Sequence, residues 1–321
     1  MMKSEPQERK FKQIKPIHVV KLCAVMFVFF LILGTAMLAA GGPWKINIDL
    51  RDGLFTVLQS DHPVIVQGYS VIVDEQVEQE LTGLTEVSIA TVMDDVILVY
   101  GSDKLRAHLQ GKCLNMGVPV RLESSLQGNK LVIETKHPKN SWGNKVFRIN
   151  WKGLNCSTAL TITIPDDYHG DLAIGTVSGG IHARNLSLAL NEVTLKTVSG
   201  DVDFSTAGYQ ELSAKTVSGD LALWNVTAPT DVNTVSGDVD IHFEKVAQTH
   251  IKTVSGDVDL VAPEGESFEV KFQSTSGEFE SSFPGLLVKS VRRSFQGSAG
   301  NGGVLVEIST TSGDCELKVA N

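Results

Sequence analysis

The chain has 321 residues, of which 20% are charged and 29 are glycine, and its formal net charge is −9 at pH 7. This composition excludes a chain that is disordered throughout, because 42% of the residues are hydrophobic and can build a core. The negative charge argues against a nucleic-acid-binding protein, which needs a basic surface.

The first 40 residues predict a membrane segment. Residues 1–21 are rich in Lys and Arg, and residues 22–40 (LCAVMFVFFLILGTAMLAA) carry no charge. A helix of this length rises roughly 28 Å, close to the thickness of a bilayer core. The basic flank predicts that residues 1–21 are cytoplasmic and that the rest of the chain is extracytoplasmic, in a cell membrane protein with a single pass. A cleaved signal peptide is the alternative, because LAAGG offers small residues for cleavage, but the length favours an uncleaved anchor.

Residues 41–165 predict an N-terminal β region. Short segments such as KINIDL, EVSIATV and LTITIP alternate or run apolar, and Gly, Asp, Asn or Pro bound them. The basic stretch Lys136–Gly153 predicts an excursion from the sheet, with Trp142 and Trp151 packed over an edge.

The cysteines give no complete framework of disulfides. Cys113 and Cys156 can form one bridge, and the sequence leaves this open. Cys315 occupies an apolar position of a repeat, which predicts a small buried hydrophobic residue. No Cys/His spacing predicts a zinc site.

Residues 166–321 contain a repeated motif. TVSGD begins at Thr197, Thr216, Thr234 and Thr253, and related copies begin at Thr176, Ser274 and Thr310. The copies lie 18–21 residues apart except the last step of 36, which suggests two coils with one motif lost around Ser294–Gly303. This period is too short for helix-pair repeats. It predicts an all-β fold, a β-solenoid with coils of 18–21 residues, preceded by one N-terminal transmembrane helix.

The motif predicts a corner between two strands. Period-two alternation places Thr and Ser on the inward face, where their hydroxyls would form a ladder. Glycine suits a corner that needs positive φ or has no room for a Cβ, and Asp can cap the free N–H groups of a turn. The predicted corner glycines are Gly179, Gly200, Gly219, Gly237, Gly256, Gly277 and Gly313. The valines that then point outward are Val198, Val217, Val235 and Val254, a candidate interaction stripe.

A metal site and a catalytic site are the alternatives to this structural interpretation. The carboxylates of Asp201, Asp220, Asp238 and Asp257 should stack, and a calcium ion could bridge them. Turn capping is favoured, because the glycine-rich pattern of calcium-binding nonapeptide repeats is absent. No nucleophile, phosphate-binding or dinucleotide-binding motif is present, so we predict no catalytic residues and no cofactor.

The expected partners follow from these elements. The chain should contact the membrane through residues 22–40 and an unknown envelope protein or glycan through its exported part. The last coil ends at Asn321 without a cap, which predicts an open strand edge and self-association through the C-terminal coil. No nucleic-acid partner is expected.

The repeated TVSGD units, preceded by VILVYGSDKLRAHLQG and LTITIP, resemble the bacterial "putative adhesin" domain family DUF4097 from about Val87 onward. The resemblance implies an exported or membrane-anchored envelope protein and supplies no catalytic or binding residues. The predicted function is therefore a non-enzymatic, membrane-anchored, extracytoplasmic module with an adhesin-like structural or protein-interaction role. An accessory sensor or regulator of envelope stress and a glycan-processing β-helix enzyme are the alternatives.

Overall fold

The computed structural model describes residues 45–49, 54–59, 62–66, 69–115, 120–137 and 155–320. The chain divides into two compact units, residues 1–67 and residues 68–321. The predicted cytoplasmic segment, the predicted membrane helix and residues 138–153 of the predicted excursion lie outside the described residues. Within the described ranges, no helix has the length and apolar character needed to cross a bilayer.

The first unit contributes a small antiparallel meander. Its strands are β1 (Lys45–Asp49), β2 (Leu54–Gln59) and β3 (His62–Val66). β2 pairs with β1 on one side and with β3 on the other.

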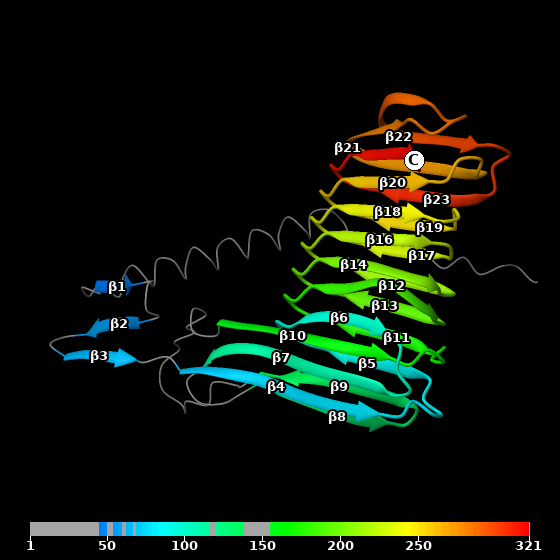
Figure 1. The fold of residues 1–321 in the computed structure, drawn as a ribbon. Helices are drawn as coiled ribbons and strands as arrows, with labels where there is room; N and C mark the ends of the chain where they lie inside the picture. The colour runs from blue at the N-terminus through cyan, green and yellow to red at the C-terminus, as the bar shows by residue number, and fades with distance from the viewer. Residues whose placement is uncertain are drawn as a thin grey trace, which may run out of the picture. The chain divides into compact units, whose positions relative to one another are not determined.

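The second unit is a stack of 21 strands, β4 to β24, joined in one continuous hydrogen-bonded sheet (Figure 1). The first strands are β4 (Tyr69–Gln79), β5 (Glu86–Ala90), β6 (Asp95–Tyr100), β7 (Leu105–Asn115), β8 (Arg121–Gln127), β9 (Lys130–Lys136) and β10 (Asn155–Ile164). The repeated coils supply β11 (Asp171–Gly175), β12 (Ile181–Ala189), β13 (Glu192–Lys196), β14 (Val202–Gly208), β15 (Glu211–Lys215), β16 (Leu221–Val226), β17 (Thr230–Asn233), β18 (Val239–Phe243), β19 (Thr249–Lys252) and β20 (Val258–Ala262). The last strands are β21 (Phe268–Ser281), β22 (Val288–Ala299), β23 (Val304–Ser309) and β24 (Cys315–Val319). The predicted all-β, solenoid-like fold is confirmed.

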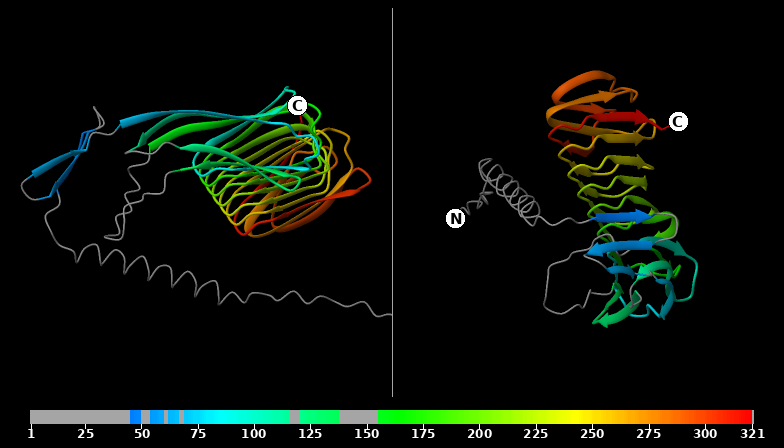
Figure 2. Two further views of the ribbon diagram at one scale, coloured as in Figure 1. Left: turned by 90° about the horizontal axis from the view of Figure 1, so that it is seen from below. Right: turned by 90° about the vertical axis from the view of Figure 1, so that its left-hand side faces the viewer.

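Each coil contributes two strands that lie on opposite sides of a common core (Figure 2). β11, β13, β15, β17 and β19 pair in parallel on one side, and β12, β14, β16, β18 and β20 do so on the other. The register aligns equivalent residues, so that Val193 pairs with Leu212 and Val202 with Leu221. These side chains are buried, because period-two alternation points them into the core from both sides.

The stack begins before the boundary predicted at residue 166. β5 and β6 form the first coil, since β5 pairs in parallel with β11 and β6 with β12. β9 and β10 continue the two sides below it, and the antiparallel strands β7, β4 and β8 cover this end. An N-terminal β region of this kind seals a core that would otherwise be exposed at the first coil.

A disulfide joins Cys113 of β7 to Cys156 of β10. The two residues are direct partners in the antiparallel register, so the pairing of the strands brings the thiols together. The sequence alone did not decide whether this disulfide forms. Cys315 is a free, buried cysteine in β24, and burial strongly raises the pKa of its thiol.

Replacing both bridged cysteines by serine should lower the free energy of unfolding by about 4 kcal/mol, from the chain-entropy cost of a loop with this separation of 43 residues. Chemical denaturation followed by circular dichroism measures the loss. A reductant should shift the unfolding midpoint of the wild type and leave that of the double variant unchanged. Equal midpoints for the wild type and the variant under oxidising conditions would contradict the prediction.

The C-terminal end of the stack differs from the sequence prediction. β23 and β24 insert between the β19–β20 coil and β21, because β23 pairs with β19 and β21, and β24 pairs with β20 and β21. The expectation that the C-terminal coil forms an open edge is therefore wrong, since both of its strands are paired on both sides. Self-association through this coil loses its basis.

The 36-residue step between the motif copies at Ser274 and Thr310 was predicted to hold two coils with one lost motif, and this prediction is also wrong. Ser294–Gly303 covers the end of β22 and the turn into β23, and β22 runs antiparallel to β21 instead of forming a coil. β22 covers the end of the core, where Phe295 stacks on Phe279 with ring centroids 4.6 Å apart. Phe268, Phe272 and Phe283 are fully buried beneath it and fill the terminal layer with aromatic rings.

Candidate functional site

The repeated motif forms one corner of every coil, between the two sides of the stack. In the TVSGD copy at 197–201, the Thr197 side chain is buried and its Oγ1 accepts a hydrogen bond from the Gly200 backbone N–H at 2.9 Å. The same bond recurs between Thr216 and Gly219 at 3.0 Å and between Thr253 and Gly256 at 3.0 Å. The threonine therefore closes its own turn from the inside.

The motif serine does not share this inward face, which corrects the sequence prediction. β13 ends at Lys196, so strand alternation stops before the corner, and Ser199 is exposed. Its Oγ donates a hydrogen bond to the Val177 carbonyl of the preceding coil at 3.3 Å. Ser218 makes the same bond to the Val198 carbonyl at 3.3 Å.

The corner glycines form a continuous column in which backbone contacts backbone. A Cβ on Gly200 would lie 1.8 Å from the Gly179 carbonyl oxygen, and a Cβ on Gly219 would lie 1.9 Å from that of Gly200. The contacts continue at 1.9–2.0 Å along the stack to Gly237, Gly256, Gly313 and Gly277 in that order. None of these glycines has a positive φ, so the motif needs glycine for space between coils.

The motif aspartates cap the backbone of the neighbouring coil. The Asp201 Oδ1 accepts from the Asp220 N–H at 3.0 Å, and the Asp220 Oδ1 accepts from the Asp238 N–H at 3.0 Å. The ladder continues through Asp257 to Asp314 at 2.8 Å and ends at the Glu278 N–H, also at 2.8 Å. Capping thus runs along the stack, where the sequence suggested capping within one turn. Among the described residues, no group of three or more His, Cys, Asp or Glu is placed to hold a metal ion.

The motif valines form a line of half-exposed apolar side chains along the outside of the corners. Val198, Val217, Val235 and Val254 are each 45–46% exposed, and the structure adds Val177 at 47% and Val92 at 43%. We call these six residues the corner ridge. With coils about 4.8 Å apart, the corner ridge is about 24 Å long.

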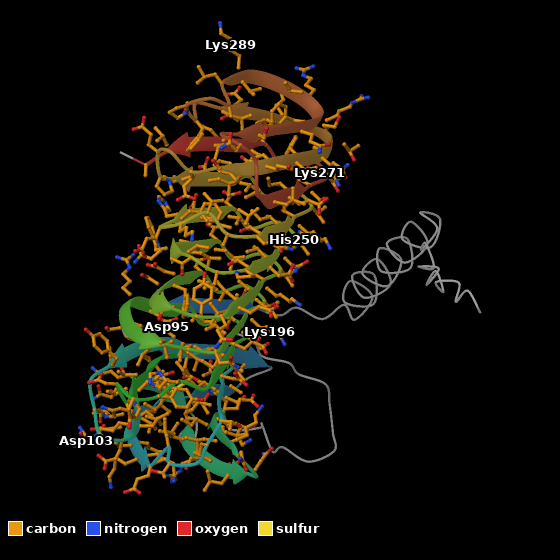
Figure 3. All side chains as sticks on the ribbon, turned by 90° about the vertical axis from the view of Figure 1, so that its right-hand side faces the viewer. Asp95, Asp103, Lys196, His250, Lys271 and Lys289 are labelled. Carbon is orange, nitrogen blue, oxygen red and sulfur yellow. A yellow bond between two sulfur atoms is a disulfide. The ribbon has the colours of Figure 1, made fainter. Side chains whose placement is uncertain are left out.

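Two lines of charge flank the corner ridge. The exposed Lys196, Lys215 and Lys252 end the strands that lead into the corner, and Figure 3 shows Lys196 on the same side of the stack as His250 of β19. The motif aspartates follow the corner and are exposed as well. The surface therefore has an apolar line with positive charge on one side and negative charge on the other. Such a surface suits a protein partner with the complementary arrangement better than a ligand whose chemistry is the same along its whole length.

Val92 identifies a corner that the sequence analysis missed. The segment TVMDD at 91–95 occupies the first corner of the stack, and the Asp95 Oδ1 accepts from the Gly180 N–H at 2.8 Å as the motif aspartates do. The sequence signal of this first corner was weak, because Met93 and Asp94 replace two of the five motif residues.

Asp94 occupies the glycine position of this first corner. The next strands along the stack, β9 and β10, carry no copy of the motif. The Asp94 side chain reaches Thr135 of β9 and Thr158 of β10 and is completely buried. The carboxylate accepts hydrogen bonds from the Oγ1 atoms of Thr135 (2.6 Å) and Thr158, and it contacts His137 Nε2 at 3.1 Å. Burial alone would raise the pKa of Asp94, but the contacts with His137, Thr135 and Thr158 outweigh it and lower the pKa below 3.8.

One cavity lies away from the corner ridge, where loops connect the strands at the other corner of the first coils. It measures about 890 Å³ and is open and polar, with Asp103, Asp167, His169, Asn191 and Gln210 among its lining residues. His169 Nδ1 contacts the Ala189 carbonyl oxygen at 3.1 Å. No hydrogen bond among the described residues joins His169 to a Ser, Thr or Cys side chain, which is the pairing that an activated nucleophile needs.

The described residues define a class: a parallel β-solenoid with two strands per coil, whose glycine corners stack directly on one another. The chain belongs to the Toastrack DUF4097 family, whose model matches residues 86–230 and 188–318. The family resemblance inferred from the repeated motif is thus confirmed. No curated protein matches the chain.

The solved structures that are similar to this chain include three bacterial proteins. One is a "putative cell adhesion protein" from Clostridium sporogenes, 12% identical, with a TM-score of 0.33 over 78% of this chain and 100% of the other. Another is a "putative adhesin" from Bacteroides fragilis, 14% identical, with a TM-score of 0.40 over 79% of this chain and 100% of the other. A "putative lipid binding protein" from Parabacteroides distasonis is 12% identical, with a TM-score of 0.36 over 77% of this chain and 97% of the other.

Proposed function

We propose that this protein is a membrane-anchored, extracytoplasmic interaction module of the bacterial envelope without enzymatic activity, and that the corner ridge is the surface that contacts its protein partner. Membership of an adhesin-like β-domain family supports the general role. The observation that carries the proposal is the corner ridge itself: six valines in line, half exposed, on a backbone held rigid by the glycine column.

Two features support an extracytoplasmic location. Residues 22–40 are apolar and follow a basic segment, as in an anchor whose N-terminus stays in the cytoplasm. The disulfide between Cys113 and Cys156 is typical of an oxidising compartment, because the cytosol keeps most thiols reduced.

The flanking charges define the chemistry of the partner. A contact strip that covers the corner ridge should be apolar along its centre, acidic where it meets Lys196, Lys215 and Lys252, and basic where it meets the motif aspartates. Each buried valine adds modest hydrophobic stabilisation, and the charges set orientation and exclude other partners.

A cysteine introduced at Val217 tests location and surface together. Protoplasts or spheroplasts that carry the full chain are treated with a membrane-impermeant maleimide that bears a photo-crosslinking group. The four native cysteines should give little background, since Cys113 and Cys156 are bridged, Cys315 is buried and Cys23 lies within the apolar segment 22–40. We expect labelling and, after illumination, one discrete crosslinked product.

Glu211→Cys is the matched control, because Glu211 is exposed on β15 at the end away from the corner. It should be labelled equally and give no such product. Absence of labelling at both positions would overturn the extracytoplasmic location. Labelling at both with equal crosslinking, or with none, would overturn the role of the corner ridge.

A further inference from the structure

β22 is the edge strand at the C-terminal end of the stack. Every strand from β5 to β24 is paired on two sides except β8 at the other end and β22, which pairs with β21 alone. Its second edge therefore leaves backbone N–H and C=O groups without strand partners among the described residues. The strand bends at Arg293, where φ is +70°, because it follows β21 around the corner at Ser274–Glu278.

The charge of β22 differs from that of the rest of the protein. The strand carries Lys289, Arg292 and Arg293 and no acidic residue, in a chain whose net charge is −9. Arg292 forms an ion pair with Glu278 at 2.6 Å. Lys289 and Arg293 are exposed and have no ion-pair partner in the part of the chain that the structure describes, and Figure 3 shows Lys289 projecting at the end of the stack.

The edge strands at the opposite end, β4 and β8, present no unpaired lysine or arginine. The acidic side chains of β4 are matched by neighbours, with Glu78 3.0 Å from Arg106 and Asp74 2.7 Å from His108. The arginine of β8, Arg121, pairs with Glu75 at 2.7 Å. β22 is thus the edge that presents both open backbone groups and free cations.

A recess with two apolar lining residues, Leu287 and Val288, adjoins the start of β22. Leu287 is 76% exposed, and with Val288 and Lys289 it lines a cavity of about 500 Å³. Glu280 and Glu316 line the same cavity and disfavour a carboxylate inside it, whereas the Lys289 side chain projects outward at the end of the stack (Figure 3). The recess therefore suits an apolar side chain, and the rest of the edge suits acidic ones.

We propose that β22 is a docking strand, which accepts an extended acidic segment of a partner protein as an additional β-strand. Main-chain hydrogen bonds would supply the affinity, and carboxylates facing Lys289 and Arg293 together with an apolar residue near Leu287 would supply the selectivity. A second copy of β22 is disfavoured as the occupant, because a pair would bring three cations from each strand into one ladder.

The test uses the full chain in nanodiscs of neutral phospholipid and a fluorescent peptide of about ten residues with alternating valine and glutamate, close to the length of β22. We expect saturable binding that weakens as salt is added, with slower amide hydrogen exchange confined to residues 288–299. A peptide of the same length that alternates valine and lysine should bind at least tenfold more weakly.

Variants Lys289→Glu and Arg293→Glu should each lower the affinity for the acidic peptide, and together they should reverse the preference between the two peptides. The matched control is Lys112→Glu with Lys245→Glu, which changes the net charge equally at two exposed lysines outside β22 and away from the corner ridge and should leave peptide binding unchanged. Equal binding of both peptides, protection outside β22, or an equal loss in the control pair would overturn the proposal. Protection of β22 that depends on protein concentration without peptide would assign the edge to a second copy instead. This assay reads amide protection at β22, whereas the proposed function is read by crosslinking at Val217, so failure here leaves the proposed function standing on its own test.

Discussion

Replacing Gly219 by alanine is expected to lower the free energy of unfolding by about 3–5 kcal/mol, although it adds a single methyl group. The new Cβ would lie 1.9 Å from the Gly200 carbonyl oxygen and 2.6 Å from its carbonyl carbon. Both atoms are backbone, so no side chain can rotate away to relieve the contact. Gly200 is itself packed on Gly179, and the two coils must therefore move apart and weaken the Asp201–Asp220 cap.

Two glycines outside the column provide the control. An added Cβ on Gly175 or on Gly208 meets nothing within 4 Å, and neither residue has a positive φ. Alanine at either position should change stability by less than about 1 kcal/mol. Thermal and chemical unfolding of the three variants under one set of conditions measures the difference, and a similar loss in all three would show that the column is not tightly packed.

The sequence predicted the repeated part of the fold because its information is local. The alternation through Leu195 and Val202 and the recurrence of Gly200 and Gly219 at fixed spacing are sufficient to predict parallel coils with a shared corner. The position of the motif serine was predicted wrongly, since alternation was extended past Lys196, where the strand ends.

The order of the last coils could not be predicted from the repeat. The segment 274–278 precedes 310–314 in the chain, yet the Asp257 carboxylate caps Asp314, and Asp314 caps Glu278. Both coils carry a copy of the corner motif, STSGE at 274–278 and TTSGD at 310–314, so either stacking order satisfies the local pattern. The reversed order depends on β22, whose antiparallel return carries the chain back to the open side of β19 and β20.

The sequence predicted only part of the corner ridge, because the repeated motif identifies only some of its valines. Val198 and its three equivalents follow from the TVSGD motif. Val177 belongs to the related copy TVSGG, and the predicted stripe did not include it. The roles of Val92 and Asp94 emerge only when β5 and β6 are paired with β11 and β12, because the first corner lies 85 residues before the next one in the chain. No local pattern identifies an aspartate in a glycine position as the end of a column.

Asp94 is expected to be the most sensitive polar residue of the described part of the chain. Asp94→Ala should lower the free energy of unfolding by about 3–5 kcal/mol, because it leaves the buried hydroxyls of Thr135 and Thr158 and the His137 imidazole without their acceptor. Asp94→Asn keeps the side-chain volume and one acceptor oxygen, so it should lower the free energy of unfolding by less than Asp94→Ala does. Asp201→Asn is the control, since Asp201 is exposed and caps one N–H, and its loss should be about 0.5–1.5 kcal/mol.

The pH dependence of stability separates the charge of Asp94 from its packing. The pKa of Asp94 is lowered in the folded protein from the ordinary value of 3.8, so the ionised carboxylate contributes stability above that pH, and the contribution is lost as pH falls through the folded-state pKa. The wild type should therefore lose stability more steeply than Asp94→Asn below about pH 4, while the two curves run parallel near neutral pH. Unfolding midpoints measured from about pH 2 to about pH 7 provide the comparison, because this range covers the ordinary titration of carboxylates. Parallel curves over the whole range would mean that Asp94 is held by packing alone, without the ionised hydrogen-bond acceptor that the geometry shows.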